Sequence, residues 1–398
     1  MDMPQSRDQW IIALSPMMRE IIDLRRHFHQ YPELSGQEKQ TKKRVMEELR
    51  RLGIPVREFQ ESHGVMGILS NGEGPCIALR ADMDALPIQE TVSLPYASCR
   101  PGIMHACGHD VHTAILLGTA RYLSTHPDQW RGTVKLLFEP AEETIGGARA
   151  MKAQGCLHDP EVDYVIGQHV NPRYPAGTFF AKGGPVSGAS DMICLKVFGT
   201  RAHGAYPEAG VDAIVIASQI ITALQTLVSR NISPLESSVL TFGTIQGGTA
   251  GNVICGEVTL EGTLRTLSPA IRSQLLDRLR TLPALMAQSM GGRAEITLTP
   301  GYPPVINDET TYPLLEETAA RLLGTEHVIR RTHPSLGVDS FGYFMDGVPG
   351  IYYDIGSGVG TALHTDTFQV DEDCLMAGIM LQCAFVHAMA QHLSGTDA

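Results

Sequence analysis

The chain has 398 residues, of which 43% are hydrophobic and 19% are charged, and its formal net charge is −12 at pH 7. This length is enough for two hydrophobic cores. The acidic balance argues against a nucleic-acid partner, because phosphate binding needs clustered Lys and Arg. The polar N-terminus lacks a signal-peptide core, and no stretch approaches the about 20 apolar residues of a membrane helix. We therefore expect a cytoplasmic protein with no membrane partner.

The first part of the chain alternates helical and strand-like patterns. Apolar spacing predicts helices over residues 9–31 and 37–53, followed by a buried strand over 76–82. Further helices are expected over 111–123 and 146–154, and further strands over 133–138 and 162–166. Short apolar strands alternating with helices predict an α/β fold with a mixed, mostly parallel sheet.

The composition changes at residues 182–190, a Gly/Pro/Ser cluster typical of a hinge. Strands are then expected over 192–197, 238–245, 257–264 and 294–299, with helices over 212–230 and 269–289. This β-α-β-β-α-β order predicts a compact α+β module. We expect a catalytic domain in two parts, 1–183 and 301–398, with the module inserted over 184–300.

Eight cysteines are scattered along the chain without a CxxC pair, so neither a disulfide scaffold nor a zinc ribbon is predicted. Seven of them are best explained as small buried hydrophobes. Cys107 differs, because Cys107-Gly-His109 lies just before a predicted helix start, where the helix dipole favours a thiolate. A thiolate and an imidazole two residues apart can chelate one metal ion, although the pair alone is a weak signal.

Glu142 and Glu143 follow the end of a predicted strand, at the sheet edge where α/β sites lie. Taken alone, adjacent glutamates usually form a solvated helix start. His169, His364 and Asp84 also follow apolar strand-like runs, and each by itself is as readily structural as functional. Five strand-exit segments with metal-binding side chains, Cys107-Gly-His109 included, together predict a metal-assisted hydrolase.

These motifs resemble the amidohydrolase branch of the di-metal aminoacylase/carboxypeptidase superfamily, which includes hippurate hydrolase, N-acyl-amino-acid amidohydrolases and indoleacetyl-amino-acid hydrolases. The resemblance runs from about Leu24 to Val386, and no single motif carries it alone. Its carriers are RHFHQYPELS at 26–35, LRADMDALP at 79–87, HACGHD at 105–110, EPAEE at 139–143, GGTAGN at 247–252 and HTDTF at 364–368. It implies a di-metal exopeptidase-like catalytic domain with an inserted lid and dimerisation domain.

The resemblance also implies a role for each residue of the site. Cys107 would bridge two divalent ions in each subunit, Glu142 would be the general base, and Asp84 would support the ligands from behind. The other metal ligands implied are His109, Glu143, His169 and His364. A mixed thiolate, imidazole and carboxylate set suits Zn, with Mn, Co and Ni as alternatives.

In the inserted module, the resemblance implies that His203 reaches the active site of the partner subunit and stabilises an oxyanion. Asn252 and Arg265 would bind the carbonyl and carboxylate of the substrate. The alternatives are a surface-loop histidine for His203 and a strand-surface ion-pair partner for Arg265. A homodimer is therefore expected, with a tetramer as the larger alternative.

Two positions depart from the family pattern. Residues 338–341 read Val-Asp-Ser-Phe where the family commonly has a Glu-Asp-Phe element, and Glu139 stands where Gln is often found. The first departure leaves substrate preference open. His112 is interpreted as a packed helix residue, and Asp110 as a helix-start or supporting group.

The predicted reaction is hydrolysis of the amide bond of an N-acetyl, N-benzoyl or similar N-acyl amino acid. A metal-activated water, with Glu142 as base, would release a carboxylate and a free amino acid. A dipeptidase or carboxypeptidase would use the same groups. A catalytically silent metal-binding or ligand-binding protein is the non-enzymatic alternative, and it predicts a lost ligand or base, whereas none is missing.

Overall fold

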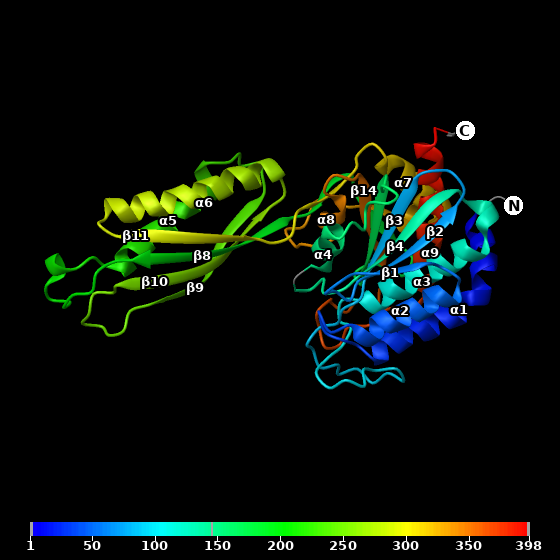
Figure 1. Cartoon of the computed structure of the whole chain (residues 1–398), viewed down its shortest axis with the longest axis horizontal. Helices are drawn as coiled ribbons and strands as arrows, with labels where there is room; N and C mark the ends of the chain where they lie inside the picture. Colours follow the sequence, from blue (N-terminus) through cyan, green and yellow to red (C-terminus); the bar gives the residue numbers. More distant parts are fainter. Residues whose placement is uncertain (1–2, 145, 396–398) are drawn as a thin grey trace. The chain divides into compact units, whose positions relative to one another are not determined.

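A computed structural model describes residues 3–144 and 146–395 of the chain, which folds into two compact units (Figure 1). Unit 1 comprises Met1–Val186, Ile306–Thr332 and Ser340–Ala398, and unit 2 comprises Ser187–Val305 and His333–Asp339. The domain limits at residues 183 and 300, and the lid role of the inserted part, stay predictions.

The main sheet of unit 1 is mixed and mostly parallel, as expected. Its strand order is β1-β2-β4-β3-β5-β14-β6-β13. The strands are β1 (Val56–Glu58), β2 (Val65–Asn71), β3 (Cys76–Asp82), β4 (Gly132–Glu139), β5 (Tyr164–Asn171), β6 (Phe179–Ala181), β13 (Val328–Arg330) and β14 (Gly350–Gly356). The central neighbours β4-β3, β3-β5 and β5-β14 are parallel, so their carboxyl ends meet at one edge. Strands β1 and β2 add an antiparallel border that the sequence patterns did not predict.

Helices lie on both sides of this sheet. Figure 1 shows α1, α3 and α9 on one side of the sheet and the short helices α4 and α8 on the other. The helices of unit 1 are α1 (Arg7–Gln30), α2 (Lys39–Arg51), α3 (His109–Thr125), α4 (Gly147–Ala153), α7 (Tyr312–Leu323), α8 (Gly342–Met345) and α9 (Asp373–Leu393), with 3-10 turns at η1 (Pro127–Gln129) and η3 (Thr325–His327). Strands β7 (Gly184–Ser187) and β12 (Val305–Asn307) form a separate pair.

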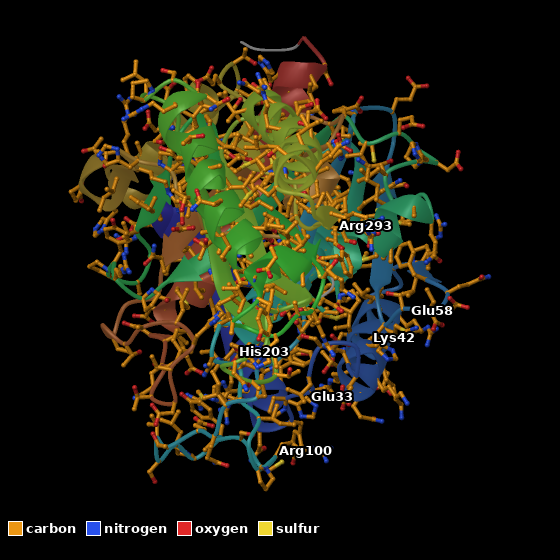
Figure 2. All side chains as sticks on the ribbon, turned by 90° about the vertical axis from the view of Figure 1, so that its left-hand side faces the viewer. Glu33, Lys42, Glu58, Arg100, His203 and Arg293 are labelled. Atoms are coloured by element: carbon orange, nitrogen blue, oxygen red, sulfur yellow. The ribbon has the colours of Figure 1, made fainter. Side chains whose placement is uncertain are left out.

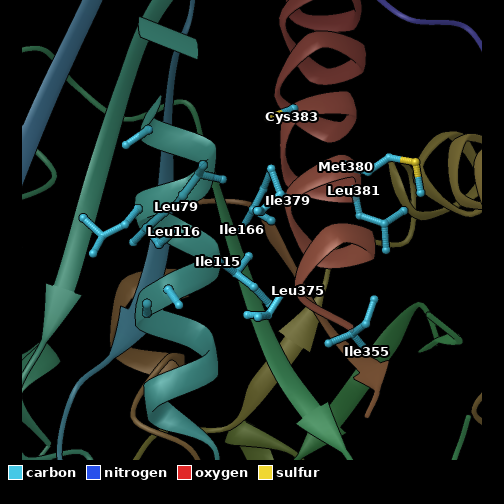
Figure 3. Packing of buried hydrophobic residues seen from close by; sticks show 14 of the residues in the cluster. Leu79, Ile115, Leu116, Ile166, Ile355, Leu375, Ile379, Met380, Leu381 and Cys383 are labelled. Carbon is cyan, nitrogen blue, oxygen red and sulfur yellow. The ribbon is translucent and has the colours of Figure 1, made fainter. Parts of the chain in front are cut away.

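In the core of unit 1, α3 and α9 pack against one another and against β3. Figure 3 shows Ile115 of α3 and Leu375 of α9 pointing toward one another. The two helices approach closely at small residues: a Cβ on Gly118 would lie 2.4 Å from Cδ1 of Ile379, and a Cβ on Gly378 would lie 2.4 Å from Cδ1 of Ile115. This close packing holds α3, whose first turn carries the candidate site.

Helices α5 (Ala213–Arg230) and α9 are long and apolar enough to cross a bilayer by length and composition alone. The expectation that no stretch approaches this length is therefore wrong. Helix α9 is apolar on all sides because it is a core helix, with 83% of its apolar window buried inside the structure. Helix α5 instead buries one stripe, which includes Ile216, Ile220 and Leu224, against the sheet of unit 2.

Helix ends and surface pairs follow local sequence signals. Ser6 and Gln9 form a capping box at the start of α1, and Asp212 caps α5 through the N–H groups of its first turn. On the surface, Lys42 and Glu58 form an ion pair at 2.9 Å (Figure 2).

Unit 2 has the predicted β-α-β-β-α-β order. Its antiparallel sheet has the strand order β11-β8-β10-β9 and is covered by α5 and α6 (Pro269–Ser289). The strands are β8 (Ala189–Phe198), β9 (Ser238–Gly247), β10 (Glu257–Thr266) and β11 (Arg293–Pro300), and η2 (Pro207–Ala209) is a 3-10 turn. Within the residues described here, β9 pairs with β10 alone and forms a sheet edge.

Candidate metal centre

Cys107 lies between two imidazoles. Its Sγ is 3.4 Å from Nε2 of His169 and 3.3 Å from Nε2 of His364. The bend that places it there needs Gly108, which has a φ of +83° and whose added Cβ would lie 2.3 Å from Val170. The Cys-Gly-His spacing therefore works because the middle residue has no side chain.

His364 is held in a strained backbone conformation. Its φ is +59°, which is uncommon for a residue other than glycine, and its N–H donates to the carbonyl of Ala106 at 2.8 Å. This bond joins the 364 loop to the residue before Cys107. Nε2 of His364 lies 3.1 Å from Oε1 of Glu143, so one imidazole faces both the thiol and the carboxylate. Strain of this kind is concentrated at functional sites.

His109 is the first residue of α3 and is buried. Its Nδ1 donates to the backbone carbonyl of Asp84 at 2.9 Å, and it lies 3.1 Å from Oδ1 of the same residue. Its Nε2 is buried and has no hydrogen-bond partner within residues 3–144 and 146–395. A buried imidazole nitrogen without a partner is costly unless it binds something, and a metal ion is the ligand that this orientation suits.

Asp84 holds two of the predicted ligands at once. Besides contacting His109, its Oδ2 accepts the backbone N–H of Glu143 at 3.0 Å and the hydroxyl of Ser35 at 2.7 Å. Burial by itself would raise the pKa of Asp84, but these hydrogen bonds and the charge of His109 lower that pKa below its ordinary value. Asp84 is thus an ionised support behind the ligands.

The two glutamates lie in a turn after β4. Ala141, with a φ of +55°, precedes them, and its N–H donates to the buried Oε1 of Glu38 at 2.7 Å. Glu142 is 8% exposed, and its Oε1 accepts the backbone N–H of Ser340 at 3.0 Å. Glu143 points instead toward His364. The neighbouring carboxylates therefore have different surroundings.

The donor atoms form overlapping groups, each within 4.8 Å: Cys107 with His109 and His169, Cys107 with Glu143 and His364, and His109 with both glutamates. Thiolate, imidazole and carboxylate are ligands of zinc and other borderline divalent metals, so these residues fit such ions. Burial raises the pKa of the Cys107 thiol well above its ordinary value, although the charge of His109 opposes this. The helix start therefore does not by itself favour the thiolate, and a bound metal ion would have to displace the proton.

His112 belongs to a further group of close donor atoms, with Asp82 and His109, but its ring is already occupied. Nδ1 donates to Oδ1 of Asp82 at 2.5 Å, and Nε2 accepts the N–H of Val170 at 2.9 Å. Burial lowers the pKa of His112 to about 4, so the ring is neutral. It is a packed residue that supports the end of β5.

Asp110 faces away from these ligands, into a buried ionic cluster. Its Oδ2 lies 2.9 Å from Nε of Arg25 and 2.8 Å from Nδ1 of His29. The cluster joins the start of α3 to α1, which fits the supporting role expected for Asp110.

His169 and Asp84 both lie at the carboxyl edge of the sheet, but only Asp84 lies after its strand as the patterns predicted. β5 continues to Asn171, so His169 is inside the strand rather than after it, while Asp84 comes two residues after β3. Sequence reasoning missed Glu38 and Ser340. Neither has a metal-binding pattern around it. The carboxylate of Glu38 accepts the backbone N–H of Ala141, and the backbone N–H of Ser340 donates to Glu142, so side-chain motifs reveal neither contact.

The remaining predicted residues belong to unit 2. His203 (labelled in Figure 2) is exposed and is bridged to Val253, and the N–H of Gly204 donates to the carbonyl of Asn252 at 2.8 Å. His203 and Asn252 are thus on neighbouring segments. Arg265 is partly buried on β10, opposite Val239 of β9 and Ser190 of β8. Their roles in substrate binding and catalysis stay predictions.

Comparison with known proteins gives the family. The family described as Peptidase family M20/M25/M40 matches residues 78–388. The chain is 40% identical over 366 residues to N-acetyl-L-cysteine deacetylase of Bacillus subtilis (strain 168), covering 92% of this chain and 87% of the relative. It is 36% identical over 379 residues to thermostable carboxypeptidase 1 of Saccharolobus solfataricus, covering 93% of this chain and 94% of the relative.

A solved structure agrees with these matches. The crystal structure of the Bacillus subtilis YXEP protein, a dinuclear metal binding peptidase from the M20 family, superposes with a TM-score of 0.82 at 32% identity, covering 95% of this chain and 99% of that chain. The chain belongs to Peptidase family M20/M25/M40 and is a hydrolase of amide or peptide bonds.

Proposed function

We propose that the protein is a two-metal amidohydrolase that cleaves N-acyl amino acids to a carboxylate and a free amino acid. The observation that carries the proposal is the convergence of donor atoms around Cys107, with a second, separately held carboxylate on Glu142 beside them. The 40% identical relative named N-acetyl-L-cysteine deacetylase supports an N-acyl amino acid as substrate.

The metal ligands in this proposal surround a shared thiolate. Cys107 would be shared between the two ions, and the residues that would complete the ligand set are His109, Glu143, His169 and His364. When bound, the two divalent ions supply polarisation of the amide carbonyl and acidification of a water molecule. Zinc is the expected metal, with manganese, cobalt and nickel as alternatives, and elemental analysis of the purified protein identifies it.

Glu142 carries out the proton transfers in this proposal. Its carboxylate takes a proton from the attacking water and delivers it to the leaving amine nitrogen. The N–H of Ser340 orients that carboxylate. Glu143 is unsuited to the same task, because its Oε1 lies 3.1 Å from His364 and a carboxylate that binds a metal loses basicity.

Replacing each glutamate in turn tests this division of roles. Glu142→Ala should keep the bound metal while kcat falls by about 10²–10⁴-fold, the usual contribution of a general base. Glu143→Ala should lose metal. Metal content and steady-state turnover are measured on both variants and on Glu47→Ala, an exposed control on α2. Unchanged turnover in Glu142→Ala would contradict the assignment of the base.

The substrate class is tested separately with N-acetyl, N-benzoyl and indoleacetyl amino acids beside dipeptides. Highest kcat/KM for one of the acyl amino acids is expected, and N-benzoylglycine tests a hippurate hydrolase activity. A carboxypeptidase or dipeptidase is the second candidate, supported by the 36% identical relative named thermostable carboxypeptidase 1. Preference for dipeptides over every acyl amino acid would establish that second candidate instead.

We further propose a homodimer in which His203 acts in the active site of the partner subunit, with Asn252 and Arg265 binding substrate. The exposed edge strand β9 supports a dimer, because it carries Val239 and Ile245, 42% and 56% exposed, beside backbone groups available for pairing.

A cytoplasmic location is proposed as well. It is supported by the eight cysteines, all in the described part of the chain and all free of disulfides, and cell fractionation tests it.

A further inference from the structure

Arg80 is a fully buried cation in the middle of unit 1 that has no part in the reaction described above. It lies on β3 and is 1% exposed. Its Nη1 donates to Oδ2 of Asp82 at 2.6 Å, its Nε donates to Oε2 of Glu139 at 2.7 Å, and its Nη2 donates to Oγ of Ser340 at 3.0 Å. One planar guanidinium therefore connects three segments that are distant in sequence.

One branch of this network leads to the metal ligands. Asp82, held by Arg80, accepts a hydrogen bond from His112, and His112 accepts the N–H of Val170. Val170 directly follows His169, whose Nδ1 donates to the carbonyl of Val170 at 2.7 Å. Arg80 thus fixes the end of β5 through two side chains and one backbone bond.

The other branch leads to the general base. Glu139, held by Arg80, accepts a hydrogen bond from the hydroxyl of Ser340 and another from the N–H of Ala148 at 2.7 Å. The backbone N–H of Ser340 donates to Oε1 of Glu142 at 3.0 Å. Ser340 is therefore fixed on its side-chain face by Arg80 and Glu139 and contacts the base through its main chain.

We infer that Arg80 is a positioning residue that sets the placement of Glu142 and of the His169 ligand together, through Ser340 and through Asp82-His112 respectively. Its effect on the base rests on the proposed function, whereas its effect on the metal ligand does not. The guanidinium has the planar donor fork that this task needs, and a lysine ammonium at the same place could not hold both carboxylates and the hydroxyl in one plane.

A purely structural ion pair is the competing explanation, and Lys135 provides the matched control. Lys135 is also a fully buried cation, on the neighbouring strand β4, and its Nζ donates to the carbonyls of Cys156, His158 and Pro160. It has no hydrogen bond to a predicted site residue within residues 3–144 and 146–395. Lys135→Met should therefore lower stability and leave metal affinity and kcat of the folded protein unchanged.

The experiment compares Arg80→Lys and Ser340→Ala with Lys135→Met. Metal affinity is measured by competition with a chelator, and Co²⁺ absorption reports the geometry around the Cys107 thiolate. Arg80→Lys should weaken metal binding by about 10–100-fold, the usual effect of removing a partner behind the ligands. It should also lower kcat at saturating metal, by about 100-fold if the base moves by about 1 Å.

Ser340→Ala separates the two branches and keeps the buried charges. It should lower kcat by about 10-fold and shift the acidic limb of the pH profile of kcat/KM, while metal affinity stays at the wild-type value. If Arg80→Lys does not fold, Ser340→Ala tests the branch that leads to Glu142. His112→Gln then tests the branch that leads to His169, by the same measurement of metal affinity.

The outcomes separate this inference from the proposed function. A wild-type protein without activity on any acyl amino acid or dipeptide would overturn the proposed function, and metal affinity would still decide the metal branch. Wild-type metal affinity, Co²⁺ spectrum and kcat in folded Arg80→Lys, or effects no larger than those of Lys135→Met, would overturn the positioning role.

Discussion

At the scale of single residues, the acidic groups around the candidate site differ in what surrounds them. Asp84 is ionised because His109, Ser35 and a backbone N–H contact its oxygens. Glu143 is ionised because His364 and His109 offset its burial. Glu38 is also buried, and burial raises its pKa to about 7 despite the backbone N–H groups that it accepts. These three carboxyl groups therefore differ in their charge states near neutral pH, because their surroundings differ.

Glu38 should make the metal-free protein less stable as the pH rises through neutrality. Its folded pKa of about 7 lies above the ordinary glutamate pKa of 4.5, so the folded state binds the proton more tightly. The stabilising contribution of Glu38 is complete below its pKa in the unfolded chain. That contribution is lost as the pH rises to its pKa in the folded protein. Across that range the loss is on the order of 3 kcal/mol, at about 1.4 kcal/mol for each pKa unit.

Glu38→Gln tests this, because the amide oxygen still accepts the N–H of Ala141 but carries no charge. The free energy of unfolding is measured in urea between pH 4.5 and 8 for both proteins. The variant should become increasingly stable relative to the wild type as pH rises. A difference that stays constant with pH would contradict the raised pKa of Glu38.

The candidate metal ligands were predictable from short motifs, since Cys-Gly-His and Glu-Glu carry metal-binding side chains. Ser340 was not, because it contacts Glu142 through a backbone N–H that every residue except proline has. The two departures from the family pattern, at residues 338–341 and at Glu139, are in contact. The hydroxyl of Ser340 donates a hydrogen bond to Oε1 of Glu139.

At the scale of elements, the long helices and central strands follow the predicted pattern, because their apolar periodicity extends over many residues. The short strands β1, β6 and β13 are three residues each and were missed, since so short a run has no measurable period. The extension of β5 through His169 was also missed. Pairing with β14, in which His169 lies opposite Asp354, continues the strand beyond its apolar part.

Packing between α3 and α9 should control stability without entering the chemistry. Ile379→Ala removes a fully buried side chain that fills the space above Gly118 (Figure 3). The expected cost is about 2–5 kcal/mol, the sum of lost burial and the cavity left behind. Chemical unfolding measures it against Ile12→Ala, whose side chain is 74% exposed on α1 and should cost little.

The activity of folded Ile379→Ala per bound metal should equal that of the wild type, because α9 supplies none of the predicted ligands. A loss of kcat greater than the loss of folded protein would show that this packing also positions the start of α3.

At the scale of the whole molecule, the predicted metal ligands belong to unit 1, and His203, Asn252 and Arg265 belong to unit 2. If the exposed edge of unit 2 forms the dimer, a charge on it should produce monomers. Val239→Lys and Ile245→Lys place that charge on β9, and Met192→Lys, 52% exposed on the interior strand β8, is the control. Sedimentation equilibrium should give monomers for the two β9 variants and a dimer for Met192→Lys. Dimers in all three variants would show that β9 is not the dimer interface.

Mixed dimers test whether His203 acts across subunits. Glu142→Ala and His203→Ala homodimers should each be nearly inactive. A hybrid with one subunit of each kind should regain one working site if His203 acts in the partner subunit, because the subunit that retains Glu142 then receives an intact histidine. If His203 acts within its own subunit, both sites of the hybrid are damaged and the hybrid stays inactive.

The sequence by itself determined the fold class, the family and a set of metal-competent side chains, because periodicity and short motifs are local properties of the chain. Only the tertiary structure decided which of those side chains meet. Each of Cys107, Glu143, His169 and His364 has a donor atom at most 3.4 Å from another member of the set, because parallel strands end at one edge. Three further residues, Arg80, Glu38 and Ser340, were recognised only in the tertiary structure. Their roles depend on contacts between distant segments, which no local pattern encodes.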